Sequence, residues 1–328
     1  MRKSNIKPSS NLFLQIKIWI LIMVFCQLAF TKAQAQIEMP QLNSYMFNHM
    51  VYNPASGGMY DTDFNANATS RIQWAGVDGA PLTNYAWADH RFRKNSMSAG
   101  LVLAYDRYGS RNFTDVAGNF TYVVRLNNNL KLGMGLRAGY TSFQFNASGS
   151  KIWDGSDPLA MPYTMNFPKF GTGLQLYNRK FYIGLSAPDI VNLNNSQFAA
   201  DKEQSFFKKY RSYLFTAGYK VKLSDGFGLY PNAKVYYFSG LDVPVRVDAA
   251  CLFEITDYFW AGANYATTGS VAAMAGTYIS SRIRFMYAYE FATKAAPVGS
   301  VTFSVHEVSL LLQLDDLFAR KNKSNIAE

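Results

Sequence analysis

Alternating hydrophobicity is the feature that most constrains how this chain can fold. Stretches of about ten residues carry apolar side chains at every second position, with Gly, polar or charged residues between them, and short turns separate the stretches. The clearest stretch runs from Leu130 to Tyr140, where every even position is apolar and every odd position is Lys, Gly or Arg. Because successive side chains of a strand point to opposite faces, this pattern predicts strands with one apolar and one polar face.

The pattern predicts fourteen strands, an even number, as is usual for bacterial single-chain membrane barrels. Every second connection is tight, whereas the two long connections, 146–168 and 188–208, both fall in the other set. Outer-membrane barrels have short periplasmic turns and longer outside loops, so this parity predicts that both termini are periplasmic. We therefore expect an all-β fold, a transmembrane antiparallel outer-membrane β-barrel over 61–318. Its strands are expected at 61–71, 82–92, 97–107, 112–124, 130–145, 169–177, 180–187, 209–221, 227–238, 243–254, 258–267, 270–279, 282–292 and 303–314.

Residues 1–35 have the three parts of a secretory signal peptide. A polar, basic region (1–17) precedes an apolar core (18–30), and Ala33-Gln34-Ala35 supplies small residues for cleavage before Gln36. The apolar run is too short to span a membrane as a helix. Cleavage removes five of the 32 basic residues and none of the 22 acidic ones, which leaves a net charge of +5. This small, dispersed charge argues against nucleic acid as a partner. We predict export to the cell outer membrane, in contact with outer-membrane lipid.

The segment before the first strand has a composition of its own. Residues 36–60 lack strand periodicity and are dense in Asn, Met and aromatic residues, and we expect a periplasmic N-terminal segment there. A short basic C-terminal tail is expected over 319–328.

The predicted interior of the barrel is polar. Charges at lumen-facing positions include Arg137, Asp248 and Glu290, but they do not say whether the lumen is open or plugged. The glycines on one face of the strand over 130–145 are expected to let a backbone or lumen side chain approach closely. Pro231 cannot donate to a ladder, so it requires a bulge or a shorter strand.

The chain carries little catalytic chemistry. Its three histidines are far apart in sequence, and no Cys/His cluster has the spacing of metal ligands. Asp89-His90 and His306-Glu307 are the obvious acid–base neighbours, but adjacent residues of a strand point to opposite faces. We therefore predict no enzyme, no metal and no cofactor.

Four motifs occur in order along the mature chain. They are Tyr52-Asn53-Pro54-Ala55-Ser56-Gly57-Gly58, Arg71-Ile72-Gln73-Trp74-Ala75-Gly76, Gly79-Ala80-Pro81-Leu82-Thr83 and His306-Glu307-Val308-Ser309-Leu310. Together they resemble motifs of the PorP/SprF family of type IX secretion system membrane proteins, known from the Bacteroidetes. The chain departs from the family pattern at Glu290, where Asp is usual, and at Ala266, where Arg is often found. These departures leave open which subgroup and which cargo are involved.

The resemblance implies a non-enzymatic outer-membrane component of the type IX secretion or gliding machinery. The partners it implies are secreted adhesin cargo with a C-terminal sorting domain, and periplasmic secretion-ring or peptidoglycan-associated lipoproteins. A diffusion channel, an outer-membrane hydrolase and a soluble β-sandwich are the alternatives. The second and third motifs flank one predicted loop. The residues of this loop fit a structural role and a contact with a partner equally well. The candidate contact residues are Asn53, Pro54, Gly58, Arg71, Gln73, Trp74, Gly76, Pro81, His306 and Glu307.

Overall fold

The computed structural model describes residues 41–60, 62–77, 79–92, 96–146, 161–192, 211–240, 243–256, 258–292 and 304–315. The predicted signal peptide (1–35) and C-terminal tail (319–328) lie outside these residues. No helix of the described part is long and apolar enough to cross a membrane.

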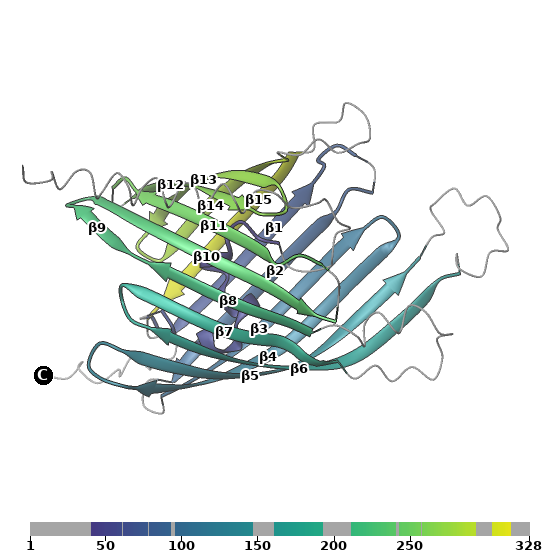
Figure 1. Ribbon diagram of the computed structural model, residues 1–328, viewed down its shortest axis with the longest axis horizontal. Coiled ribbons are helices and arrows are strands. Elements are labelled where there is room, and N and C mark those ends of the chain that lie inside the picture. Colours follow the sequence, from purple (N-terminus) through teal and green to yellow (C-terminus); the bar gives the residue numbers. More distant parts are fainter. Residues whose placement is uncertain are drawn as a thin grey trace, which may run out of the picture.

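The described residues form one antiparallel sheet that closes on itself (Figure 1). β10 pairs with β8 and then, beyond Lys220, with β9, so β8 and β9 share one position and the barrel has fourteen. The pairings β1–β15 and β10–β11 close the cylinder. The strands are β1 (Phe64–Gln73), β2 (Leu82–Phe92), β3 (Met97–Tyr108), β4 (Arg111–Arg125), β5 (Lys131–Phe145), β6 (Tyr163–Tyr177), β7 (Phe181–Asn192), β8 (Arg211–Tyr219), β9 (Val221–Ser224), β10 (Phe227–Ser239), β11 (Arg246–Glu254), β12 (Phe259–Ala266), β13 (Ser270–Ser280), β14 (Ile283–Ala292) and β15 (Ser304–Leu314).

All fourteen predicted strands are present, and most ends fall within three residues of the prediction. The largest differences are in β6 and β7. The predicted strands stop beside Pro168 and Pro188, whereas β6 and β7 continue through these prolines. Among the described residues, β6 pairs with β7 only from Lys169 onward, so Pro168 stands where β6 is an edge strand and needs no donor on that side. Pro188 is accommodated by a register shift at Gly171, where a Cβ would lie 2.2 Å from the Pro188 carbonyl oxygen.

Pro231 has a different effect from the bulge or shorter strand that we expected. β10 runs through Pro231, which pairs with Cys251 on β11. On its other side, the neighbouring strand is interrupted between Tyr219 and Val221, directly opposite the proline. The missing N–H therefore breaks the partner strand into β8 and β9 and leaves β10 continuous.

The barrel is apolar outside and mixed inside, as the alternation predicts. Leu136 and Leu185 are 62% and 57% exposed on the outer face, while their neighbours Arg137 and Ser186 are buried on the inner face. An apolar band facing outward is the arrangement of a membrane barrel, whereas a soluble sandwich buries its apolar face.

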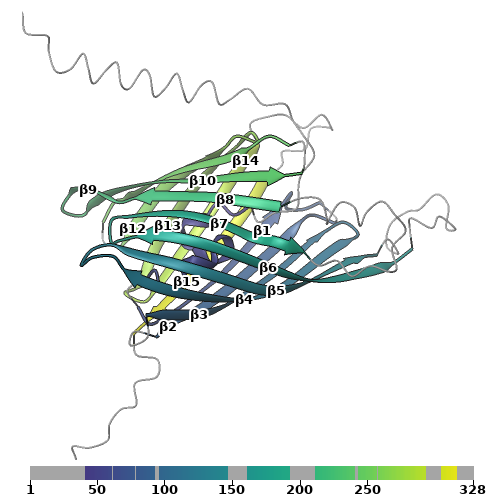
Figure 2. The same cartoon turned by 60° about the horizontal axis from the view of Figure 1, so that its bottom comes forward.

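The N-terminal segment lies inside the cylinder, where Figures 1 and 2 show its purple coils surrounded by strands. It contains η1 (Tyr45–Phe47), α2 (His49–Tyr52) and η2 (Pro54–Ser56), and nearly all of its residues are buried. We refer to residues 41–60 as the plug. The predicted periplasmic segment over 36–60 is thus corrected for its described part, which fills the lumen. The alternation of tight and long connections predicts only at which end of the barrel β1 begins. It does not predict where a segment that precedes β1 will lie.

Candidate functional site: the plugged lumen

The contacts of the plug trace its path through the lumen. We call the end with the β2–β3, β4–β5 and β6–β7 connections the turn end, and the end with the β5–β6 and β7–β8 connections the loop end. Asn43 bonds to Glu290 and Glu307, which lie within three residues of the loop ends of β14 and β15. Gly58 bonds to Asp89, three residues from the turn end of β2. The described chain therefore starts in the loop half of the lumen and descends to the turn end, where β1 begins.

Glu307 holds the upper part of the plug. Its two carboxylate oxygens accept the backbone N–H groups of Asn43 and Ser44, each at 2.8 Å, and also the Ser44 hydroxyl. Glu307 is fully buried. Several donors converging on one carboxylate satisfy its lone pairs without water, which is what makes a buried carboxylate tolerable.

Arg71 connects Glu307 to Glu290 on the next strand. Its guanidinium lies 2.9 Å from the Glu290 carboxylate and 3.5 Å from that of Glu307. Glu290 in turn accepts the Asn43 side-chain amide at 2.9 Å. Two predicted motif residues from opposite ends of the chain, Arg71 and Glu307, thus meet in one buried network. The plug adds neutral hydrogen-bond donors to the two carboxylates of this network.

Lys234 and Asp248 hold the middle of the plug. The Lys234 ammonium is completely buried, 3.0 Å from the Asp248 carboxylate and 4.6 Å from the ring centres of both Tyr45 and Tyr52. Arg246 adds a second cation, 2.9 Å from Asp248. Cations over aromatic faces are attracted by the ring quadrupole, so the wall's charges bind the plug's tyrosines directly.

Arg137 binds the plug from the opposite wall. It donates to the carbonyl oxygens of Val51 at 3.0 Å and Met50 at 2.5 Å, and to the Asn119 side chain at 2.8 Å. These carbonyls lie at the end of α2, where no helical donor remains for them. A cation at a helix C-terminus is also favoured by the helix dipole.

The Asn53-Pro54 turn fastens the lower part of the plug. The Asn53 side chain accepts the Ala55 N–H at 2.9 Å, which starts η2, and its amide donates to Gln175 at 2.8 Å. The Pro54 carbonyl accepts the Thr121 hydroxyl at 2.7 Å. Gly58, with φ of 67°, donates to Asp89 at 2.9 Å and accepts from Tyr177 at 3.3 Å. The first motif is therefore a set of contacts between plug and wall.

Two glycines of β5 make room for this turn, as the sequence predicts. A Cβ on Gly133 would lie 2.3 Å from the Ala55 oxygen, and one on Gly135 would lie 2.2 Å from the Ala55 nitrogen. Only a residue without a side chain allows the plug backbone to approach the strand this closely.

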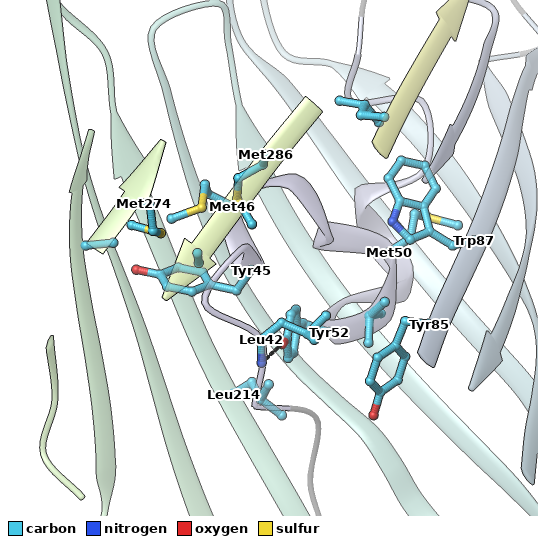
Figure 3. Close-up of a cluster of buried hydrophobic side chains, with 14 of the residues drawn as sticks. Leu42, Tyr45, Met46, Met50, Tyr52, Tyr85, Trp87, Leu214, Met274 and Met286 are labelled. Atoms are coloured by element: carbon cyan, nitrogen blue, oxygen red, sulfur yellow. Dashed lines mark hydrogen bonds between the residues drawn. The ribbon is translucent and has the colours of Figure 1, made fainter. Parts of the chain in front are cut away.

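Apolar contacts complete the fit (Figure 3). Met46 lies beside Met274 and Met286, and Met50 lies against Trp87. Leu42 donates its N–H to the Tyr52 hydroxyl at 3.2 Å, which closes the upper part of the plug on itself. Unbranched methionines fill irregular gaps well, which explains their density in this segment.

The remaining motif residues lie away from the plug. Gln73 is the last residue of β1, and Trp74, Gly76 and Pro81 belong to the β1–β2 loop at the loop end of the barrel. The Gln73 N–H donates to the Pro81 carbonyl at 2.9 Å. Trp74 has φ of 56° and donates its N–H to Ser304 at 2.8 Å. A left-handed conformation is rare for a bulky residue, so the loop holds Trp74 in a strained position.

His306 lies on the outer face, where its Nδ1 is 2.7 Å from the Tyr287 hydroxyl, while Glu307 points inward. Likewise Asp89 faces the plug, while the His90 ring packs edge-on against Phe92. Neither acid–base pair that a hydrolase would need is assembled. No group of three or more His, Cys, Asp or Glu that could hold a metal occurs within the described ranges.

Sequence reasoning missed several plug contacts, notably Asn43, Ser44, Asn48 and Lys234. Asn48 accepts from the Trp87 indole at 3.1 Å and donates to Thr69 at 3.1 Å. The signal available was the dense Asn and aromatic composition of the segment, and a lysine in phase with lumen-facing residues of β10. Neither feature specifies which strand a side chain will meet.

The architecture and motifs were compared with known protein families. A model described as type IX secretion system membrane protein PorP/SprF matches residues 33–311, well over half of the chain. The chain belongs to the PorP/SprF family. It is thus a β-barrel of a secretion-system membrane family, and this family together with the apolar outer face supports an outer-membrane location.

Comparison with curated proteins and solved structures adds little about this PorP/SprF member. No curated protein matches the chain. The CymD monoaromatic hydrocarbon channel is 14% identical with a TM-score of 0.49, covering 87% of this chain and 95% of that one. The P. putida toluene transporter TodX is 9% identical with a TM-score of 0.48, covering 84% and 95%. Omp33 of Acinetobacter baumannii is 7% identical with a TM-score of 0.45, covering 77% and 98%.

Proposed function

We propose that this protein is a non-enzymatic outer-membrane scaffold of the type IX secretion or gliding machinery. In this role it supports export or surface anchoring of adhesin-like cargo that carries a C-terminal sorting domain. The family match over residues 33–311 carries the proposal. Periplasmic secretion-ring proteins or peptidoglycan-associated lipoproteins are its further partners.

In the proposed mechanism, the two ends of the barrel contact different partners. The apolar outer face anchors the barrel in lipid, and the turn end faces the periplasm and its machinery. The β1–β2 loop at the loop end presents Trp74 to cargo from a rigid scaffold, an arrangement common to binding loops. Its strained backbone supports this role, because strain persists where surrounding structure enforces a particular presentation.

Affinity purification from outer membranes tests the proposal. We expect the native protein to recover a large adhesin or periplasmic ring proteins, and Trp74→Ala to recover less cargo. Tyr258→Ala is the matched control, since Tyr258 is a 65% exposed aromatic residue at the turn end. Repeated recovery of the barrel alone would count against the proposal. An equal loss of cargo with Trp74→Ala and Tyr258→Ala would show that Trp74 has no specific role in cargo binding.

A diffusion channel is the competing function, and it requires an unobstructed lumen. The plug supports the scaffold instead, because it is hydrogen-bonded to the wall at both of its ends and in the middle. The purified protein in a planar bilayer is expected to show low conductance. Steady conductance of porin size from the native protein would favour the channel.

A further inference from the structure

A cavity of about 550 Å³ lies at the turn end, between the plug and the wall. Ligand pockets typically have about 300–1,000 Å³. Phe47 and Tyr60 of the plug line one side of the cavity, and Tyr182, Tyr230 and Trp260 of the wall line the other. None of the plug–wall contacts described above accounts for this space. Its aromatic lining suits an apolar or aromatic group.

Two buried hydrogen-bond donors of this lining have no partner within the described part of the chain. They are the Trp260 indole N–H, in a side chain that is only 4% exposed, and the Tyr60 hydroxyl. A buried donor without a partner loses its hydrogen bonds to water and gains none in return, so such groups are normally paired. A ligand with acceptor oxygens would supply the missing partners.

The rim of the cavity is positively charged. Arg179, Lys180, Lys220 and Arg284 line it, against a single carboxylate, Glu254, which is 2.7 Å from Lys220. The Arg284 guanidinium stacks over the Tyr278 ring at 4.8 Å, which fixes its position at the mouth. An excess of positive charge around a partly desolvated cavity attracts an anion.

Amide groups complete the lining. Asn178 and Gln313 both border the cavity. The Asn178 carbonyl oxygen accepts the N–H groups of Lys180 and Phe181, and the Gln313 amide donates to Asn65, which leaves an amide donor on Asn178 and an amide acceptor on Gln313 for a peptide backbone. The cavity thus combines an aromatic interior, unpaired donors, peptide-compatible amides and a cationic rim. A fatty acid would leave the amides without a role, and a sugar would leave the positive charge without one.

We propose that this cavity binds the carboxylate-terminated end of a partner polypeptide, with an apolar or aromatic side chain next to the carboxylate. The side chain packs among Phe47, Tyr182 and Trp260, and the carboxylate reaches Arg284 and the unpaired donors. The proposal concerns a second site, at the opposite end of the barrel from the β1–β2 loop, and does not depend on the cargo-binding role of Trp74.

Calorimetric titration of the mature, full-length protein in detergent tests this site. The probes are an acetylated tripeptide of two alanines and a C-terminal phenylalanine, as the free acid and as the amide. We expect the acid to bind about tenfold more tightly than the amide, because only the acid makes charge-assisted hydrogen bonds. Arg284→Gln is expected to abolish most of this difference, and Trp260→Phe to weaken binding of the acid about fivefold.

Lys222→Gln is the matched control, since Lys222 is a 74% exposed lysine that pairs with Asp225 and does not line the cavity. It should leave binding unchanged. Each variant is first required to show the heat-dependent gel shift of a folded barrel. A soluble short-chain phosphatidylglycerol serves as a lipid probe. No binding of the acid, equal binding of acid and amide, undiminished binding by Arg284→Gln, or binding of the lipid alone would overturn the proposal.

Discussion

At the scale of single residues, the plug is held by buried wall charges that pair with one another and also bind neutral polar groups of the plug. Glu307 is the acceptor shared by Arg71 and the plug backbone at Asn43 and Ser44. Its sequence position gave no hint of this, because Glu307 follows His306 in a motif that could equally have faced a partner. Removing one member of a buried charge network costs far more than the net contribution of the network, because the remaining charges are left uncompensated.

Glu307→Gln is therefore expected to weaken docking of the plug by about 3 kcal/mol, the lower end of the range for breaking a buried pair. Hydrogen exchange of residues 41–47 should become faster, while exchange of the barrel strands should not. Asp225→Asn, which removes a carboxylate 98% exposed at the β9–β10 turn, is the matched control and should have no effect. Unchanged exchange in Glu307→Gln would show that apolar contacts alone hold the plug.

The His49 side chain predicts a pH dependence of plug docking. Burial lowers the pKa of His49 from 6.5 to about 4, and its ring lies 4.6 Å from that of Tyr182. Because the undocked segment takes up a proton more readily than the docked one, docking is strongest above pH 6.5 and weakens as pH falls toward 4. The loss reaches about 3 kcal/mol. Hydrogen exchange of the plug between pH 7 and 4 measures it, and His49→Gln should weaken the dependence in this window.

At the scale of elements, the plug and β5 fit by backbone contact. β5 carries Gly133 and Gly135 at lumen-facing positions where a side chain would collide with η2. Gly118, on the outer face of β4, has only the Ala138 oxygen near a Cβ, at 3.9 Å. The alternation already places Gly133 and Gly135 on the inner face and Gly118 on the outer face, but only the tertiary structure shows that the two inner glycines meet η2.

Gly135→Ala is expected to displace the plug and raise conductance in a planar bilayer, because the colliding atoms are backbone and cannot move aside cheaply. Gly118→Ala should behave as the native protein. Both variants should retain the heat-dependent gel shift, since the strand pairing of β5 is unaffected. Low conductance in Gly135→Ala would mean that η2 can shift without releasing the plug.

At the scale of the whole molecule, the barrel is defined by which face of every strand is apolar. Large apolar side chains such as Leu101, Leu136 and Leu185 are 47–62% exposed around the cylinder, a state that only lipid makes favourable. The same closure joins the described strands into one ring.

Leu136→Arg places a charge on the outer face in the middle of β5 and should destabilise the membrane-inserted barrel by about 2–4 kcal/mol. Leu126→Arg, at a 51% exposed residue of the β4–β5 turn, is the matched control and should be tolerated in water. Urea-dependent folding into lipid vesicles measures both variants. If Leu136→Arg were as stable as Leu126→Arg, the outer face would not be in hydrocarbon.

The sequence by itself determined the strands, their faces and their number. These follow from alternation, a local property in which each residue's environment is set by its immediate neighbours, so β2 was predicted to the residue. It also determined the family, because the motifs of Asn53-Pro54, Arg71 and Glu307 recur in order. Its failures at strand level were at prolines such as Pro188 and Pro231, where the outcome depends on the neighbouring strand.

Only the tertiary structure decided where the N-terminal segment goes and what the motifs contact. A non-periodic segment carries no signal of its location, and the contacts of Asn43 with Glu307 or Lys234 with Tyr52 join residues roughly two hundred positions apart or more. Such pairs are fixed by the closure of the barrel around the plug, which brings the strands' inner faces together in one space. That closure is a property of the whole sheet, and no local pattern encodes it.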